Sequence, residues 1–279
     1  MNPLTFTLRR QPGTWLDLSP LTPDRLSGLS PKAIRSIRLR CGRQAVRAGD
    51  IFNISGENVA TLKFPQGSRH FLRLGHGMTQ GRIGVDGHAG HYLGQGMRDG
   101  RIAVRGNAGD WVASGMEDGT IEISGNAGDF VGAAAAGQAH GMSGGRVVVS
   151  GNVGRRMGDH MRRGTILVFG NAGDFAGSRM LAGTLLIIGR INSGVGQGTR
   201  RGTIILARKP PHILATFSDC GELKMEFLRL LFKQLADIGK RFDFLRRFGP
   251  EARRYAGDLA AGGQGEILVL LNAARERPA

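Results

Sequence analysis

Glycine recurs along this chain at a fixed interval. Glycines followed by Asn-Ala-Gly or a close variant stand 19 residues apart, with one longer step of 26 residues; they are Gly87, Gly106, Gly125, Gly151, Gly170 and Gly189. Internal repeats of about 20 residues are typical of solenoids, in which each repeat packs on its neighbours. The interval therefore assigns most of the 46 glycines to architecture rather than to a flexible linker.

Each repeat contains a short apolar element with a period of two. The apolar pairs are Ile102/Val104, Ile121/Ile123, Val147/Val149, Ile166/Val168, Leu185/Ile187 and Ile204/Leu206. This alternation predicts a strand with one buried and one exposed face. A helix is excluded because each interior glycine costs about 1 kcal/mol, whereas tight turns use glycine at positive φ. We predict an all-β fold, a parallel β-helix (solenoid) of rungs of about 19 residues, with about three short strands in each rung.

The segments that flank the repeats differ from them in composition. Residues 1–48 predict an N-terminal α/β preamble, with a strand at residues 4–8 and a helix capped by Ser30 and started by Pro31. The β-helix is expected over residues 49–207. Residues 208–279 predict a C-terminal cap, in which a helix containing Leu230 packs with Phe244 across the open end of the solenoid, and residues 265–271 form a closing strand.

Three further columns of like residues repeat with the rungs. One turn position carries Asn107, Asn126, Asn152 and Asn171. Because asparagine tolerates left-handed turns and its amide can hydrogen-bond to the next rung, we predict a structural ladder. A second column carries Tyr92, Trp111, Phe130 and Phe175, and a third carries Met97, Met116, Met142, Met161 and Met180. We expect both of these columns to be files of core residues.

The charge of the chain restricts its partners. With 38 Lys and Arg against 22 Asp and Glu, the formal net charge is +16, which predicts a polyanionic partner. Two cysteines are too few for a disulfide framework, and no CxxC motif is present. The first residues lack the pattern of a signal peptide, and no apolar run is long enough to span a membrane. We therefore expect a reduced, soluble, cytoplasmic protein without membrane association.

No combination of residues predicts an active site, so we expect no catalytic residue on this chain. No Ser/His/Asp or Cys/His set stands out, and the glycine-rich loops lack the strand–loop–helix context of nucleotide sites. His88 and His91 occupy the positions held by asparagine and aspartate in the next rung. A zinc site needs three or four converging ligands, so we predict that these histidines are ladder variants and that no metal is bound.

Arginines recur at equivalent positions of the later rungs. Arg162 and Arg163 share columns with Arg200 and Arg201, two rungs and about 10 Å away. Arg98 lies on the same line, and Arg156 and Arg179 add to the charge of this region. These seven residues are either ordinary solvated surface or a basic track that binds an extended polyanion. A further column carries Arg82, Arg101 and Arg146 directly before the Ile-x-Ile strand.

The repeat and its flanks also resemble a known family. The pattern GNAGDxVGxGMxxGxIxIxG, the preamble that ends in Gly49-Asp50-Ile51-Phe52, and the C-terminal Gly257-Asp258-Leu259 resemble the C subunit of formylmethanofuran dehydrogenase. The basic chain without a cluster domain looks like the bacterial form, which is the C subunit of the formyltransferase/hydrolase complex. The repeat is also similar to the C-terminal domain of the glutamate synthase large subunit, which leaves a glutamate-synthase-like solenoid domain as an alternative.

The resemblance implies a right-handed coil and a non-catalytic place in a four-subunit assembly. Its partners would be an amidohydrolase-like hydrolase subunit, a formyltransferase subunit and a further dehydrogenase-like subunit. The complex would move a formyl group from formyltetrahydromethanopterin to methanofuran and release formate, a step of formaldehyde oxidation in methylotrophs. No cofactor would be bound covalently; polyglutamylated methanofuran would be shared by the complex.

Two hypotheses for the arginines follow from this resemblance. In the first, Arg98, Arg156, Arg162, Arg163, Arg179, Arg200 and Arg201 guide the polyglutamyl tail of the cofactor. In the second, the chain is a pure structural scaffold whose arginines lie in interfaces with acidic subunits. Nucleic acid is not the expected partner, because aromatic residues are only 6% of the chain.

Overall fold

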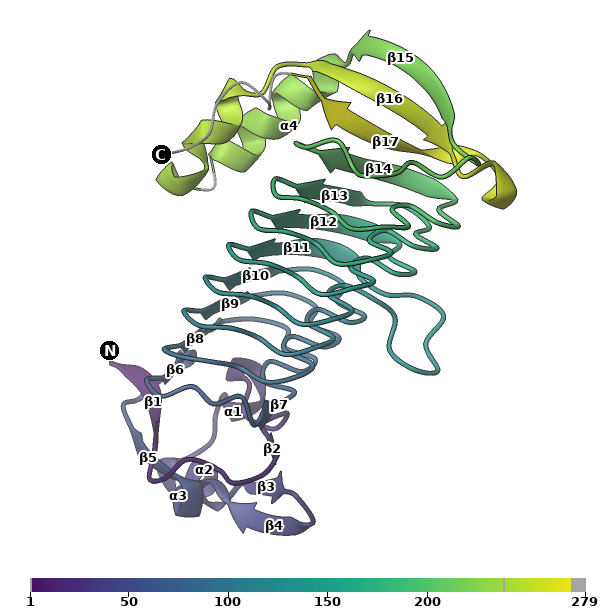
Figure 1. Cartoon of the computed structure of the whole chain (residues 1–279). Coiled ribbons are helices and arrows are strands. Elements are labelled where there is room, and N and C mark those ends of the chain that lie inside the picture. Colours follow the sequence, from purple (N-terminus) through teal and green to yellow (C-terminus); the bar gives the residue numbers. More distant parts are fainter. Residues whose placement is uncertain (1, 238, 272–279) are drawn as a thin grey trace.

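The computed structural model describes residues 2–237 and 239–271, and it shows an elongated coil whose rungs stack from the N-terminal to the C-terminal part (Figure 1). Each rung contributes one strand to a long sheet, and successive strands pair in parallel. These strands are β6 (Asn58–Phe64), β8 (Arg82–Val85), β9 (Arg101–Val104), β10 (Thr120–Ile123), β11 (Ser143–Val149), β12 (Arg163–Val168), β13 (Thr184–Ile187) and β14 (Arg201–Leu206). The large parallel sheet agrees with the predicted all-β solenoid; the right-handed coil stays a prediction.

The other sides of each rung are turns rather than strands. Outside the named strands, the described rungs are joined there by isolated parallel bridges, such as Ala127 with Val153 and Ala172 with Ile191. The prediction of about three strands per rung was therefore wrong. Closely spaced residues at positive φ bend the backbone too often for a strand to form, and amide hydrogen bonds between rungs satisfy the turns instead.

The N-terminal segment closes one end of the sheet. Ser30 accepts a hydrogen bond from the amide of Ala33 and caps a helix that begins at Pro31, which confirms the predicted helix start. β5 pairs antiparallel with β1, and β1 pairs in parallel with β6, which is followed by β8 and the strands of the later rungs. The elements of this segment are β1 (Pro3–Leu8), β2 (Leu16–Asp17), α1 (Pro23–Leu26), α2 (Pro31–Ser36), β3 (Arg38–Cys41), β4 (Gln44–Arg47), α3 (Ala48–Ile51), β5 (Phe52–Ser55) and, after β6, β7 (Phe71–Leu72).

The C-terminal segment extends the sheet and covers its outer face. β17 pairs in parallel with β14, and β16 and β15 then add antiparallel strands, so the end of the coil is closed by strands. The expected strand at residues 265–271 is thus confirmed. The elements here are β15 (Ser218–Lys224), α4 (Glu226–Ala236), η1 (Lys240–Arg247), β16 (Glu251–Gly257), η2 (Leu259–Ala261) and β17 (Gln264–Leu270).

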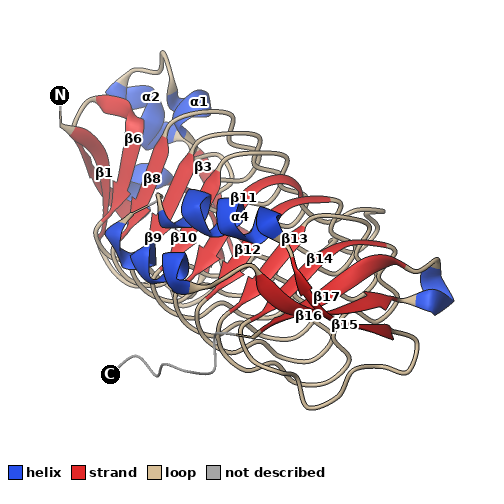
Figure 2. Ribbon diagram, turned by 90° about the horizontal axis from the view of Figure 1, so that it is seen from above, coloured by secondary structure: helices blue, strands red, loops and turns tan. Residues whose placement is uncertain are grey.

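The helix α4 does not pack across the open end of the solenoid, so that prediction was wrong. The helix lies along the flank of the sheet (Figure 2), where Leu228 and Phe232 pack on the outward side chains of β11 to β14. The side chain of Leu230 points away from this contact and is 64% exposed. The strands explain this position of the helix, since their outward central residues are large and apolar where the helix covers them; these residues are Val148, Leu167, Leu186 and Ile205.

The interior of the coil is filled by the columns that the repeat predicts. The inward residues of the strands and the methionine column, from Met97 to Met180, are buried. The prediction that the aromatic column is core was wrong. Tyr92, Trp111 and Phe130 lie on the outside of a turn, half-buried and at positive φ, and their rings stack at centroid separations of 5.4 and 4.7 Å.

Candidate functional site

Two rungs depart from the glycine pattern at one turn. The residue before the buried methionine is glycine in most rungs, for example Gly96 and Gly115, with φ of 61° and 65°. Two later rungs place His160 and Arg179 there, still at φ of 57° and 51°. Left-handed backbone costs a residue with a Cβ about 1–2 kcal/mol, so these rungs keep a strained side chain where glycine would be unstrained.

A buried carboxylate holds the side chains around this turn. Asp159 is only 6% exposed and accepts hydrogen bonds from Ser178 Oγ at 2.9 Å and from Arg179 Nε and Nη2 at 3.0 and 2.6 Å. The guanidinium of Arg156 lies 3.9 Å away, and His160 Nδ1 lies 3.5 Å away. One negative charge thus organises two arginines and a histidine, and the cluster as a whole stays basic.

The cluster borders a pocket of about 720 Å³ that we call the basic notch. The notch lies between the loop inserted before β11, which projects from the coil in Figure 1, and the turn η2. Its lining consists of Ala139, His140, His160, Arg179, Leu181, Gly198, Arg200, Ala260 and Ala261. Segments more than 100 residues apart in the sequence therefore form one site.

Asp258 attaches η2 to the last complete rung at the edge of the notch. Its carboxylate accepts hydrogen bonds from the amides of Gly198 and Ala260, each at 2.9 Å. Burial raises the pKa of Asp258, but these amides and the hydroxyl of Thr216 outweigh burial and hold the pKa below its usual value. The charged carboxylate thereby keeps η2 against Gly198.

Arg200, which lines the notch, and Arg162, two rungs away, have no carboxylate partner among the described residues. Arg162, Leu181 and Arg200 occupy one column on three successive rungs, and both arginines are exposed. The same column carries Arg98 and Glu117 in earlier rungs, where Arg98 Nε lies 3.5 Å from Glu117. The column is therefore electrically neutral near β9 and β10 and positive near the notch.

The structure brings together some of the seven predicted arginines. Arg179 and Arg200 line the notch, Arg156 reaches Asp159, and Arg162 lies two rungs from Arg200. Arg98 lies five rungs from Arg200, about 24 Å away.

Arg163 and Arg201 belong to the adjacent column, where they are the first residues of β12 and β14. Arg201 Nε donates to Gln264 Oε1 at 2.7 Å. Sequence reasoning missed Asp159, His140 and His160 as members of the site. The sequence pattern that could have indicated this site is the presence of His160 and Arg179 directly before a methionine, where most other rungs have glycine.

The asparagine column makes hydrogen bonds between rungs. The side-chain oxygens of Asn107, Asn126 and Asn152 accept from the amides of the next asparagine at 2.8–2.9 Å, and Asn171 accepts from Arg190. This is the arrangement that a structural ladder requires.

His88 and His91 make the same contacts as the asparagine and aspartate of later rungs. Their Nδ1 atoms accept from the amides of Asn107 and Asp110 at 3.1 and 3.0 Å. Among the described residues, no group of three or more His, Cys, Asp or Glu side chains is arranged to hold a metal ion. In this part of the chain no helix has the length and hydrophobicity to cross a membrane either.

Comparison with known proteins identifies the family. A family model described as GXGXG motif matches residues 48–219, which is more than half of the chain. A chain in the crystal structure of the formyltransferase/hydrolase complex (FhcABCD) from Methylorubrum extorquens, in complex with methylofuran, is 37% identical and superimposes with a TM-score of 0.86. That match covers 95% of this chain and 99% of the other.

Curated relatives show the same relationship over a shorter segment. The C subunit of the formyltransferase/hydrolase complex Fhc of M. extorquens is 39% identical over 89 residues, 32% of this chain. The C subunit of the tungsten-containing formylmethanofuran dehydrogenase 2 of Methanothermobacter thermautotrophicus is 35% identical over 98 residues, 33% of this chain. The matched segments span 34% and 36% of these two relatives. The chain therefore belongs to the GXGXG-motif family, in the group that contains the C subunits of formylmethanofuran dehydrogenases and of formyltransferase/hydrolase complexes.

Proposed function

We propose that this chain is the non-catalytic C subunit of a formyltransferase/hydrolase complex. The complex would transfer a formyl group from formyltetrahydromethanopterin to methanofuran and release formate. Its other subunits would be an amidohydrolase-like hydrolase, a formyltransferase and a further dehydrogenase-like subunit. The match over 99% of a chain from the FhcABCD complex supports this assignment.

Within the complex, the basic notch and the arginines beside it would guide the polyglutamyl tail of the methanofuran cofactor. The observation that carries this proposal is that Arg162 and Arg200, which have no carboxylate partner among the described residues, share one exposed column beside the notch. Guanidinium groups suit carboxylates because they donate two parallel hydrogen bonds. The set of donors therefore fits a tail whose repeating group is a carboxylate.

The expected contribution of each arginine is modest. An exposed ion pair contributes about 0–1 kcal/mol, so Arg162 and Arg200 together account for about 0.5–1.5 kcal/mol of tail binding. This corresponds to a change in affinity of about twofold to tenfold. Screening by salt weakens such contacts, so the contribution falls as ionic strength rises.

The test replaces both Arg162 and Arg200 in the assembled complex. In Arg162→Gln/Arg200→Gln, the KM for polyglutamylated cofactor is expected to rise about twofold to tenfold at low salt, with kcat unchanged and with a weaker salt dependence of KM. Arg98→Gln is the matched control, because Arg98 is already paired with Glu117. Equal KM values and equal salt dependence in wild type and the double variant would contradict tail guiding.

A second candidate function is a pure scaffold, with the arginines in subunit interfaces. The apolar side chains of Leu223, Phe227 and Leu230 are 41%, 42% and 64% exposed, which suits a surface covered by a partner. Arg162→Glu/Arg200→Glu separates the two candidates by size-exclusion chromatography of the complex. Loss of assembly supports the scaffold, whereas an intact complex with a raised KM supports tail guiding.

A further inference from the structure

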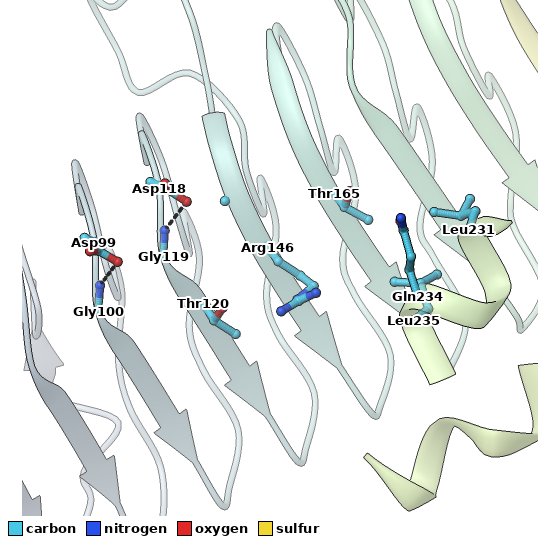
Figure 3. A pocket seen from close by; sticks show the side chains of 11 residues that line it. Asp99, Gly100, Asp118, Gly119, Thr120, Arg146, Thr165, Leu231, Gln234 and Leu235 are labelled. Carbon is cyan, nitrogen blue, oxygen red and sulfur yellow. Dashed lines mark hydrogen bonds between the residues drawn. The ribbon is translucent and has the colours of Figure 1, made fainter. Parts of the chain in front are cut away.

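A second polar pocket lies on the outward face of the parallel strands, beside α4. It has a volume of about 430 Å³, and we call it the α4 recess. In Figure 3, Arg146 lies between Thr120 and Thr165 on adjacent strands, and Gln234 of α4 faces them. The pairing of Thr120 with Arg146 and of Arg146 with Thr165 places these three side chains in one outward file, about 4.8 Å apart.

Arg146 is the unsatisfied group of this recess. Among the described residues, its Nε, which is removed from solvent, has no hydrogen-bond partner, and no carboxylate pairs with its guanidinium. Arg101 occupies the same file and donates to Glu122 at 2.6 Å. Glu122 belongs to the rung that follows Arg101, and the corresponding residue of the rung that follows Arg146 is Leu167, which is buried beneath α4. Packing of the helix has therefore replaced the acid that would neutralise this arginine.

The wall of the recess formed by the turns before β9 and β10 supplies acceptors. Asp99 and Asp118 lie on successive rungs, and one carboxylate oxygen of each accepts a hydrogen bond from the amide of the following glycine, at 2.6 and 2.7 Å (Figure 3). The second oxygen of each has no partner among the described residues. Two carboxylates on this wall disfavour an extended polyanion and favour a ligand with a cationic group on their side.

We propose that the α4 recess binds a small zwitterion of the amino-acid type. The ligand's carboxylate accepts from Arg146, with the hydroxyls of Thr120 and Thr165 beside it. Its ammonium group donates to Asp118. A guanidinium with no carboxylate partner among the described residues keeps an unneutralised charge, and the ligand's carboxylate would pair with it. This site is independent of the proposed tail-guiding function, because it uses none of the arginines assigned to the notch.

The test follows the Nε–H resonance of Arg146 by NMR in the full-length chain. Titration with glycine is expected to shift this resonance saturably. Acetate, which lacks the ammonium group, is expected to bind about tenfold more weakly because one charge-assisted hydrogen bond is lost. In Asp118→Asn, which keeps the acceptor for the amide of Gly119, glycine binding is expected to fall about tenfold while acetate binding does not fall.

The control and a second variant make the proposal falsifiable. Arg82→Gln removes an exposed arginine from the same file outside the recess, and glycine binding is expected to stay unchanged. Arg146→Lys keeps the charge but loses the planar donor set; by calorimetric titration, it is expected to weaken glycine and acetate alike. The proposal is overturned if glycine produces no saturable shift, if glycine and acetate bind equally, or if Arg146→Lys binds glycine like wild type.

Discussion

His160 and Arg179 offer a direct test of why two rungs keep a side chain at a strained turn. Both residues have a φ near +55°, and glycine stands at the equivalent turn in rungs such as that of Gly115. Replacement of either by glycine removes the same backbone strain. The two differ in what their side chains do, because Arg179 makes two hydrogen bonds to Asp159, whereas His160 lies 3.5 Å from the same carboxylate.

The two glycine substitutions are expected to change the free energy of unfolding in opposite directions. Relief of left-handed strain contributes about 1–2 kcal/mol, and the greater flexibility of unfolded glycine removes about 0.5–1 kcal/mol of that gain. His160→Gly is therefore expected to raise the free energy of unfolding by about 0.5–1 kcal/mol. Arg179→Gly gains the same amount but leaves buried Asp159 without its main partner. With a discount for the half-exposed arginine, that loss is about 2–3 kcal/mol, and the net destabilisation is about 1–2 kcal/mol.

The measurement is urea unfolding of the two variants and wild type, monitored by circular dichroism at constant pH. His160→Ala serves as the matched control, since it removes the imidazole but keeps a Cβ and hence the strain. It is expected to lie at or below wild-type stability. If His160→Gly destabilises the chain as much as Arg179→Gly does, the assignment of strain to this turn is wrong.

Two further predictions concern other parts of the coil. Burial, followed by the nearby charges of Arg25 and Arg73, lowers the pKa of His76 below 6.5. As pH falls, the unfolded chain therefore binds a proton at this histidine before the folded chain does. The contribution of neutral His76 to the free energy of unfolding is fully present above pH 6.5 and is lost as pH falls toward the lowered pKa. The resulting slope of the free energy of unfolding against pH is at most about 1.4 kcal/mol per pH unit, and His76→Gln should reduce it. If thermal unfolding between pH 5 and pH 7 gives the same slope for the variant and wild type, His76 is not the source of the pH dependence. Asn126→Ala should lower the free energy of unfolding by about 0.5–1.5 kcal/mol through loss of the acceptor for the Asn152 amide, whereas Asn126→Asp, which keeps the acceptor, should stay near wild type in urea unfolding.

The position of α4 shows how far the repeat alone could predict the fold. A helix near residue 230 follows from apolar spacing, but its place depends on which surface of the coil is apolar. The outward central residue of the strand is Gly84, Ala103 and Glu122 in early rungs and changes to Val148 and later apolar residues. This change from small or charged to large apolar residues is present in the sequence and indicates that another element covers this face of the later strands. An interpretation that treats all rungs as equivalent does not detect it.

The basic notch was predictable only in part. Equivalent spacing placed Arg162 and Arg200 in one column, because the rungs repeat with the period of the sequence. Arg98 and Glu117 are also equivalent positions of adjacent rungs, so their pairing could have been predicted from the same spacing, but it was missed. No local pattern indicates that Asp159 lies beneath Arg179, or that the inserted loop and η2 form two walls of one pocket.

The sequence by itself determined the features that repeat with the rung. These are the parallel strands, the buried methionines and the hydrogen bonds between like turns, since each follows from a short-range pattern copied along one axis. The tertiary structure decided what breaks the repeat: the flank that α4 covers, which arginines meet a carboxylate and the walls of the two pockets. These depend on contacts between segments that are distant in the sequence, and such contacts are set by the packing of the whole chain rather than by the period of any one rung.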